Sequence, residues 1–336
     1  MKMILSAGFA AAAGFDAAPS PRRAPRVSRA PRAPRERKLS GLCDLGGANL
    51  VVWVCLIVWL SACSAAVPTQ TPLPPTPSPT SQPTETPAPT PIPTSAASAI
   101  ALNCEDEASI TIGEYQAQNN TWGKGDLSGW SQCIGVELSP AGTLAGRWKW
   151  DWLDTGGGVK AYPEIIFGQK PGSAASTSAA LPVKLRDLRA AVISYEVDSN
   201  YTGGGNLTFD LWLTNTPNPS TWGAPPITHE IMIWLESHGG LNPGGVQMDL
   251  ISIGGAKYAV YLGDDFGDGW RYIAFNSVKS QVGVGTLDLA DFLAYLQEKN
   301  LATGDEYLAS IEFGNEVVRG AGETLLHQYQ VAIQTK

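Results

Sequence analysis

Charged residues are scarce in this chain, and histidine is scarcer still. Asp, Glu, Lys and Arg together make up 16% of the 336 residues, and there are only 3 His. So little charge, together with 36 Gly and 11 Trp, excludes a coiled coil, a helical solenoid and a nucleic-acid binder of the basic kind. The composition is instead typical of an all-β protein with many turns, and the length allows one large domain or two ordinary ones.

Cysteine is also sparse, with five residues in the whole chain. Three of them lie at or before residue 63, which leaves Cys104 and Cys133 as a pair in the rest of the chain. An exported domain with two cysteines most simply forms one disulfide, so we expect that bond; two free thiols are the alternative. Neither these cysteines nor any His has the spacing of a metal-ligand pair, so we expect no zinc site.

Long apolar runs are rare, and the one at residues 48–62 (ANLVVWVCLIVWLSA) is short. A membrane-spanning helix needs about 20 residues, whereas this run follows a basic stretch with seven Arg at 20–38. That order predicts a signal peptide. The run ends in Leu60-Ser61-Ala62-Cys63, which resembles a bacterial lipobox and predicts lipidation of Cys63. The alternative is an ordinary signal peptide followed by an incidental cysteine, and a translation start near Leu39 would explain the long leader.

The chain divides into three parts on composition. Residues 1–62 form a basic N-terminal extension with the signal peptide, residues 63–102 a Pro/Thr-rich disordered linker, and residues 103–336 a globular domain. Residues 68–94 hold 11 Pro and 8 Thr, which favours an extended polyproline II spacer. We therefore expect export, as a cell-surface lipoprotein or a secreted protein, with the lipid anchor as the only membrane contact.

The part after the signal peptide is acidic. Residues 63–336 carry 14 Lys and Arg against 28 Asp and Glu, a net charge of −14. Such a surface repels polyphosphates and anionic lipid headgroups but does not repel a neutral polymer. Nucleic acid is therefore excluded as a partner.

Short alternating segments, separated by Gly, Pro and Asn about every ten residues, predict strands throughout 103–336. One segment differs, because apolar residues at 289, 292, 293 and 296 have helical spacing, with Asp288 as N-cap. We predict a two-sheet sandwich of jelly-roll type with one packed helix. The predicted strands are 147–152, 191–197, 207–214, 229–236, 248–253, 257–263, 270–278, 308–318 and 327–333.

Alternation assigns the side chains of each strand to two faces. In 229–236 the aliphatic residues point one way and Glu230, Met232 and Trp234 the other; in 207–214 Asp210 and Trp212 share a face. Treating 308–318 as one strand aligns Glu312, Gly314 and Glu316, with the glycine leaving room for a ligand across the strand. In 147–152 the three tryptophans share a face.

Carboxylates and indoles on one sheet face are what a sugar polymer requires. Indoles stack on the apolar faces of pyranose rings, and two carboxylates across a groove can cleave a glycosidic bond. The alternative is that these tryptophans are partly buried sheet residues and the glutamates are solvated. For the whole set this structural alternative is disfavoured, because burying a carboxylate costs free energy and such a group is rarely buried without a function.

The same residues resemble glycoside hydrolase family 12, the compact endoglucanases, over essentially all of 103–336. The most specific match is Glu230-Ile-Met-Ile-Trp-Leu235, which is similar to the family's nucleophile strand. The supporting segments, in the family's order, are Asn119-Asn-Thr-Trp-Gly123, Trp148-Lys-Trp150, Lys160-Ala-Tyr-Pro-Glu-Ile-Ile-Phe-Gly168, Asp210-Leu-Trp-Leu213, the 291–297 helix and Glu312-Phe-Gly-Asn-Glu316. The Cys104–Cys133 spacing also resembles that of the family's N-terminal disulfide.

The resemblance implies a concave jelly roll with an open substrate cleft and a retaining double displacement. Glu230 would be the nucleophile, Glu316 the acid/base, and Asp210 would hydrogen-bond Glu230 and tune its ionisation. This mechanism would need no metal and no organic cofactor. Glu312 is the reserve candidate for the acid. Asn315, which directly precedes Glu316, differs from the residue that the resemblance leads us to expect there. The substrate-binding residues would be Trp122, Asn120, Trp148, Trp150, Met232 and Trp234.

Three functions are therefore weighed. The first is a monomeric endo-β-1,4-glucanase (a cellulase) that acts on β-glucan polysaccharide. The second is a related hydrolase that prefers xyloglucan or mixed-linkage β-glucan. The third is a non-catalytic carbohydrate-binding lipoprotein, which the presence of both carboxylates disfavours.

Overall fold

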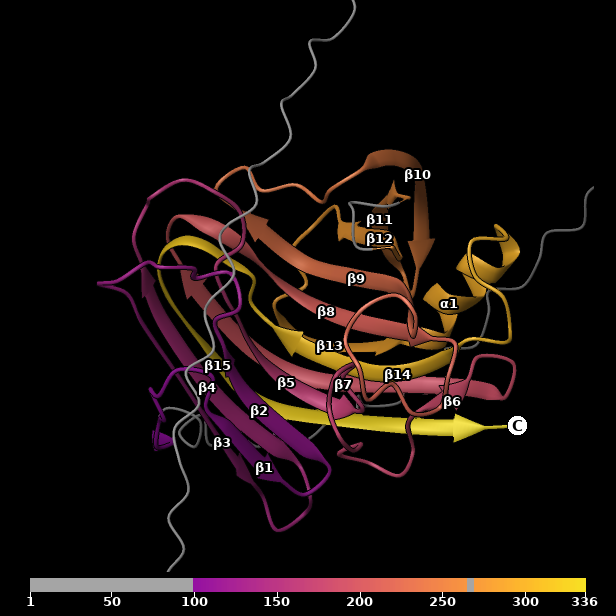
Figure 1. Cartoon of the computed structure of the whole chain (residues 1–336), viewed down its shortest axis with the longest axis horizontal. Helices are drawn as coiled ribbons and strands as arrows, with labels where there is room; N and C mark the ends of the chain where they lie inside the picture. Colours follow the sequence, from indigo (N-terminus) through magenta and orange to yellow (C-terminus); the bar gives the residue numbers. More distant parts are fainter. Residues whose placement is uncertain (1–98, 265–268) are drawn as a thin grey trace, which may run out of the picture. The chain divides into compact units, whose positions relative to one another are not determined.

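The computed structural model describes residues 99–264 and 269–336, which form two packed β-sheets and one α-helix (Figure 1). The predicted N-terminal extension and signal peptide, Cys63 and nearly all of the predicted linker lie outside the described residues. Within the described ranges, no helix is long and apolar enough to cross a bilayer. The elements are β1 (Ser109–Ile112), β2 (Tyr115–Asn120), β3 (Ser131–Leu138), β4 (Leu144–Trp152), β5 (Tyr162–Gly168), β6 (Val183–Lys184), β7 (Leu188–Tyr201), β8 (Gly204–Thr214), β9 (Ile227–His238), β10 (Val246–Ile253), β11 (Ala256–Gly263), β12 (Arg271–Ser277), β13 (Gly283–Asp288), α1 (Leu289–Glu298), β14 (Tyr307–Gly314) and β15 (Val317–Thr335).

Two sheets make up this domain, and the long strand β15 joins them. The first sheet has the order β3-β4-β15-β7-β13 and is antiparallel. The second has the order β1-β2-β5-β14-β8-β9-β12-β11-β10 and is antiparallel except where β12 runs parallel to β9. Strand β15 begins beside β8 in the second sheet and then continues between β4 and β7 in the first. The all-β sandwich with one helix that the sequence predicts is confirmed.

Side chains from both sheets fill the space between them. The aliphatic faces predicted for two central strands are fully buried there, namely Phe209, Leu211 and Leu213 of β8 and Ile231, Ile233 and Leu235 of β9. The opposite faces of β8 and β9 are thereby directed away from the core, because alternate side chains of a strand point to opposite sides. Those outer faces carry Asp210 and Glu230.

Helix α1 has the predicted position, N-cap and apolar stripe. The Asp288 side chain accepts a hydrogen bond from the Ala290 amide, which is the N-cap arrangement. The four apolar residues of its stripe are buried, and Phe292 lies edge-on against Tyr258 of β11 and Phe275 of β12. The helix therefore closes the core beneath these two strands.

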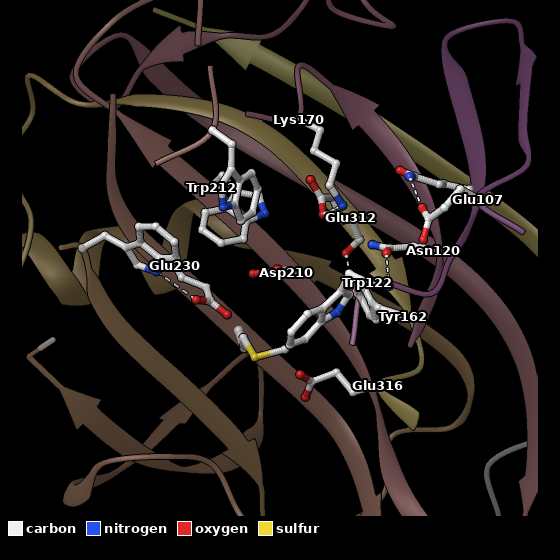
Figure 2. Close-up of a pocket in the computed structure, with 14 residues that line it drawn as sticks. Glu107, Asn120, Trp122, Tyr162, Lys170, Asp210, Trp212, Glu230, Glu312 and Glu316 are labelled. Carbon is white, nitrogen blue, oxygen red and sulfur yellow. Dashed lines mark hydrogen bonds and ion pairs between the residues drawn. The ribbon is translucent and has the colours of Figure 1, made fainter. Parts of the chain in front are cut away.

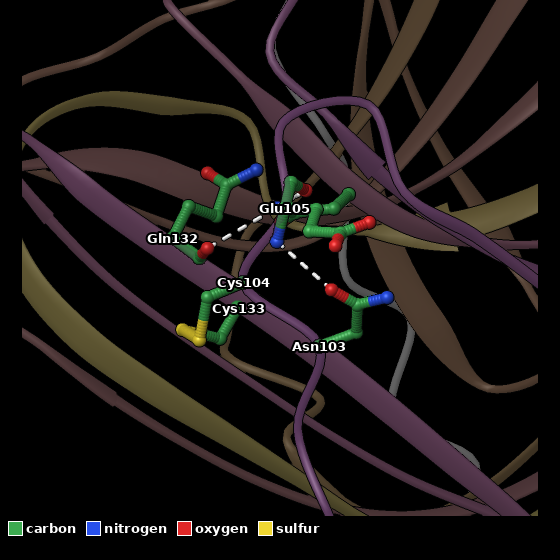
Figure 3. Close-up of a disulfide and its surroundings, with 6 residues drawn as sticks. Asn103, Cys104, Glu105, Gln132 and Cys133 are labelled. Atoms are coloured by element: carbon green, nitrogen blue, oxygen red, sulfur yellow. Dashed lines mark hydrogen bonds between the residues drawn. A yellow bond between two sulfur atoms is a disulfide. The ribbon is translucent and has the colours of Figure 1, made fainter.

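The predicted disulfide between Cys104 and Cys133 is confirmed (Figure 3). Next to it, Asn103 exchanges both backbone hydrogen bonds with Ile134 of β3. The Asn119 side chain donates to the carbonyls of Glu105 and Gln132. Covalent and hydrogen bonds thus attach the start of the domain to β2 and β3.

The tryptophans of β4 do share one face, but that face is the core. Trp148 is 0% exposed and donates its indole N–H to Asn315 Oδ1 at 2.7 Å. Trp150 is also buried and lies over β15, where an added Cβ on Gly322 would approach its ring to 2.5 Å. The expected substrate-binding role of Trp148 and Trp150 is therefore wrong, because neither ring is accessible to a sugar.

Residues 308–318 do not form one continuous strand. Strand β14 ends at Gly314 and β15 begins at Val317, so that Asn315 and Glu316 lie in the link between them. The room at Gly314 is not for a ligand either. An added Cβ would lie 2.2 Å from the Pro163 carbonyl oxygen of β5, and the glycine is required for the close approach of two strands.

Gly314→Ala is accordingly expected to lower the free energy of unfolding by about 1–3 kcal/mol, because the backbone of β5 must move away. Gly158→Ala is the matched control, since an added Cβ there meets nothing within 4 Å. Denaturant unfolding of both variants measures the difference. Equal stability of the two variants would contradict this account of Gly314.

Candidate active site

A cleft of about 500 Å³ opens on the second sheet (Figure 2). Its lining comes from β2, β5, β8, β9 and β14 and from the segments next to them. The residues that line it are Glu107, Gln118, Asn120, Trp122, Tyr162, Lys170, Asp210, Trp212, Trp222, Glu230, Met232, Trp270, Glu312 and Glu316.

The two expected catalytic carboxylates line this same cleft although they are 86 residues apart in sequence. Glu230 stands on β9 opposite Trp212 of β8. Its Oε2 accepts a hydrogen bond of 3.0 Å from the indole N–H of Trp270. This donor favours the ionised form of the carboxylate and limits its rotation.

Glu316 is held by a single asparagine from two directions. Asn206 of β8 donates from Nδ2 to Glu316 Oε2 at 2.5 Å, and its Oδ1 accepts the Glu316 amide at 3.1 Å. Burial raises the pKa of Glu316 to about 7, although the Asn206 hydrogen bond opposes the rise. A carboxyl group with this pKa can both donate and accept a proton near neutral pH.

The residue before Glu316 anchors the link to the core. Asn315 Oδ1 accepts from Trp148 Nε1 at 2.7 Å and from Thr324 Oγ1 at 2.8 Å. Its Nδ2 donates to the Asn206 carbonyl at 2.9 Å. Trp148 thus supports Glu316 from within the core rather than contacting a ligand.

Asp210 lies between the two glutamates on the floor of the cleft (Figure 2). On the ladder it faces Met232, so it is diagonal to Glu230. The side chain is buried, and its Oδ1 has no hydrogen-bond partner among the described residues. Burial, followed by the charge of Glu230, raises the pKa of Asp210 well above its usual range. Asp210 is therefore able to carry a proton beside Glu230.

Two further buried carboxylates share one lysine. Lys170 Nζ lies 2.7 Å from Glu164 Oε1 and 3.1 Å from Glu312 Oε2. Burial lowers the pKa of Lys170, but the two neighbouring charges outweigh it and the pKa rises. Lys170 thus remains a cation at the cleft wall. Glu312, the reserve candidate for the acid, is occupied by this ion pair and by Ser310 Oγ at 3.0 Å.

Trp122 and Asn120 lie at the cleft as expected. The Trp122 side chain is 66% exposed. Asn120 is committed to the protein, because its Nδ2 donates to Glu164 Oε1 at 2.7 Å and its Oδ1 accepts the Trp122 amide at 3.1 Å. We infer that Asn120 positions the loop of Trp122.

Met232 lines the cleft, whereas Trp234 does not. Trp234 is on the predicted face of β9 but is buried in a small cluster with Met232, Tyr272 and Ala274. Its indole N–H points to Met232 Sδ at 3.4 Å. Trp234 is therefore not placed to contact substrate as expected. It packs against Met232 instead.

Sequence reasoning did not assign several residues of the site. Trp270 lies just before β12, and only the parallel pairing of β12 with β9 brings it to Glu230. Lys170 and Trp222 are on loops, where no periodicity indicates which way a side chain points. The abundance of tryptophan indicates a sugar-binding surface, but only the fold shows which of the rings face the cleft.

Comparison with known proteins identifies the family of this chain. The family model "Glycosyl hydrolase family 12" matches residues 113–334. Among curated relatives, Endoglucanase S of Pectobacterium parmentieri is 28% identical over 244 residues, which cover 71% of this chain and 89% of the relative. A probable xyloglucan-specific endo-β-1,4-glucanase A of Neosartorya fischeri is 26% identical over 251 residues, covering 71% and 94%.

Solved structures give the same result. A family 12 xyloglucanase from Bacillus licheniformis superposes with a TM-score of 0.62 at 28% identity, covering 70% of this chain and 100% of the other. An endoglucanase from Rhodothermus marinus gives a TM-score of 0.60 at 26% identity, again covering 70% and 100%. With two carboxylates of this kind in one cleft and a family model matched over most of the domain, the chain belongs to glycosyl hydrolase family 12.

Proposed function

We propose that this protein is a retaining endo-β-1,4-glucanase that cleaves internal bonds of β-glucan chains. The observation that carries the proposal is the meeting of Glu230 and Glu316, from separate segments, in one cleft. By their descriptions, one relative named above is an endoglucanase and the other a probable xyloglucan-specific endo-β-1,4-glucanase. The cleft also displays indole rings, which suit the apolar faces of glucosyl units.

In the first step, Glu230 attacks the anomeric carbon while Glu316 donates its proton to the leaving glycosidic oxygen. The hydrogen bond from Trp270 orients the Glu230 carboxylate and stabilises its negative charge. A protonated Asp210 can donate to Glu230 and stabilise its charge until the covalent bond forms. The products are a glycosyl–enzyme ester and the released end of the chain.

In the second step, the ester removes the negative charge of Glu230, so Glu316 can act as a base. It takes a proton from water, the water oxygen attacks the anomeric carbon, and Glu230 leaves as a carboxylate. Two inversions give net retention. This route requires the two carboxyl groups to be about 5–5.5 Å apart, whereas an inverting enzyme separates them further.

The test is the stereochemistry and identity of the first products. Proton NMR of a fresh digest of barley β-glucan should show the β-anomer before mutarotation. Initial appearance of the α-anomer would contradict retention. Reducing-sugar release from carboxymethylcellulose, barley β-glucan and xyloglucan by the 103–336 fragment ranks the substrates.

The same assay separates the remaining alternatives. Preference for xyloglucan would support the specificity that some relatives carry in their names. Preference for mixed-linkage glucan would support the other related specificity. Binding to insoluble cellulose without release of new ends would favour a non-catalytic module. The presence of Glu230 and Glu316 in one cleft disfavours that outcome.

Asn206→Ala is expected to move the alkaline limb of the pH–activity profile to higher pH, by about half a unit or more. Asn206 donates to the charged carboxylate of Glu316, so its removal raises the pKa and the acid stays protonated longer. We also expect kcat to fall about tenfold, because the carboxyl group loses its support. Asn242→Ala, an exposed position, is the matched control. A limb that stays in place or moves to lower pH would contradict this role.

We further propose that the protein is exported and acts as a monomer tethered by lipid at Cys63. The export and the lipid anchor are inferred from the composition of the leader and linker. Mass spectrometry of the mature N-terminus in a bacterial host would identify a diacylglycerol on Cys63. A mature chain that begins at another residue and is released into the medium would support simple secretion instead.

A further inference from the structure

Three tryptophans form a wall beside the nucleophile. Trp212, Trp222 and Trp270 contact one another with ring centroids 5.0–5.8 Å apart, each pair close to perpendicular. Trp212 and Trp270 are buried, and Trp270 is the ring that donates to Glu230. Trp222 is 54% exposed. The two inner rings therefore set the plane of the outer one.

Trp222, the outer ring of the wall, differs from the two inner rings in its exposure to solvent. Among the described residues, Trp122 and Trp222 are the tryptophans that are more than half exposed, and both line the cleft. An indole left in water costs free energy that a buried position would not. Trp212 adds to this cost, because its buried indole N–H has no hydrogen-bond partner among the described residues. Such costs are typical of a surface kept for a ligand.

The loop that carries Trp222 is fixed from both sides. The Ile227 amide donates to the Gly223 carbonyl at 3.0 Å, and Asn218 Oδ1 accepts from Gln169 Nε2 at 2.9 Å. The Gly172 amide donates to the Pro219 carbonyl at 2.9 Å. A ring held in place before binding loses little entropy when a ligand arrives.

We propose that Trp222 is a stacking platform for a pyranosyl ring of the substrate other than the unit that Glu230 attacks. Trp222 contacts Trp270, and Trp270 in turn donates to the Glu230 carboxylate. A sugar on Trp222 is therefore placed one ring away from the reacting unit. The ring is a main-chain glucose or a xylosyl branch, which share the apolar face that an indole binds. Trp222 thus determines which glucans are bound productively. This inference rests on the proposed function.

The test compares wild type, Trp222→Ala and Trp222→Phe on three kinds of substrate. These are cellohexaose, polymeric xyloglucan and an activated aryl β-cellobioside, which is too short to need the platform. Trp222→Ala should lower kcat/KM about tenfold or more on at least one of the long substrates, and by less than about threefold on the aryl cellobioside. Trp222→Phe should recover most of the loss, because a flat ring remains.

The pattern of kcat/KM losses across the substrates identifies the sugar ring that Trp222 binds. A loss on both long substrates indicates a main-chain glucose, and a loss confined to xyloglucan indicates a branch. An equal loss on all three substrates indicates a structural effect through Trp270 and would overturn the proposal. So would unchanged kinetics on all of them.

A binding measurement separates this proposal from the catalytic one. Calorimetric titration of cellohexaose and of xyloglucan oligosaccharide uses a Glu316→Gln background, with and without Trp222→Ala. Weaker binding by about tenfold without Trp222 supports the platform even if wild type hydrolyses no glucan, which would sink only the proposed function. Equal affinity for both ligands would overturn the platform while leaving hydrolysis intact.

Discussion

Glu230→Ala is expected to reduce turnover of soluble β-glucan by about four orders of magnitude or more, because the covalent intermediate cannot form. The side chain lies in the cleft and outside the apolar core, so the variant should unfold close to the wild-type temperature. Glu137→Ala is the matched control, since Glu137 is an exposed glutamate of strand β3 that does not line the cleft. Near-normal turnover by Glu230→Ala would defeat the assignment.

Azide can then identify the face on which Glu230 acts. In Glu230→Ala, azide can occupy the vacated space and attack an activated aryl β-cellobioside directly. The expected product is the α-glycosyl azide, formed by one inversion with release of the aryl group. A β-glycosyl azide from this variant would mean that the nucleophile is still present and is another residue.

Glu316→Ala is expected to produce a loss that depends on the leaving group. Cleavage of polymer should fall by about two to four orders of magnitude, because general acid catalysis is lost. An aryl cellobioside with a good leaving group needs no proton, so its first step should stay fast and show a burst. Hydrolysis of the ester then becomes rate-limiting, because the base is also missing.

The pH profile supplies an independent check on Glu316. The wild-type enzyme should lose activity as pH rises through about 7, where the raised pKa of Glu316 lets the acid ionise. In Glu316→Ala this alkaline limb should be absent, and azide should give the β-glycosyl azide by displacing Glu230. A limb that persists unchanged would assign the acid to another group, with Glu312 as the next candidate despite its ion pair with Lys170.

Strand alternation predicted the inner and outer faces of β8 and β9 correctly, and with them the position of Asp210, Glu230 and Met232. It was misapplied to β4. There the other face carries Arg147, Lys149 and Asp151, which is the polar-out pattern of a strand that buries its tryptophans.

The link at Asn315 and Glu316 shows a different limit. Alternation through 308–318 placed Glu316 in register with Glu312, yet the chain leaves β14 at Gly314 and begins β15 at Val317. The position of Glu316 depends on Asn206, which is 110 residues away and binds it from two sides. No local pattern encodes that contact.

The sequence by itself determined the fold class, the helix with its Asp288 cap, the Cys104–Cys133 bond and the strand that carries Glu230. These follow from periodicity, composition and cysteine number, which are local or countable properties. Only the tertiary structure decided that Trp270 reaches Glu230, that Asn206 holds Glu316, and that Trp148 is core while Trp222 faces the cleft. Those facts depend on which strands become neighbours, and pairing over long separations is set by the packing of the whole domain rather than by any segment.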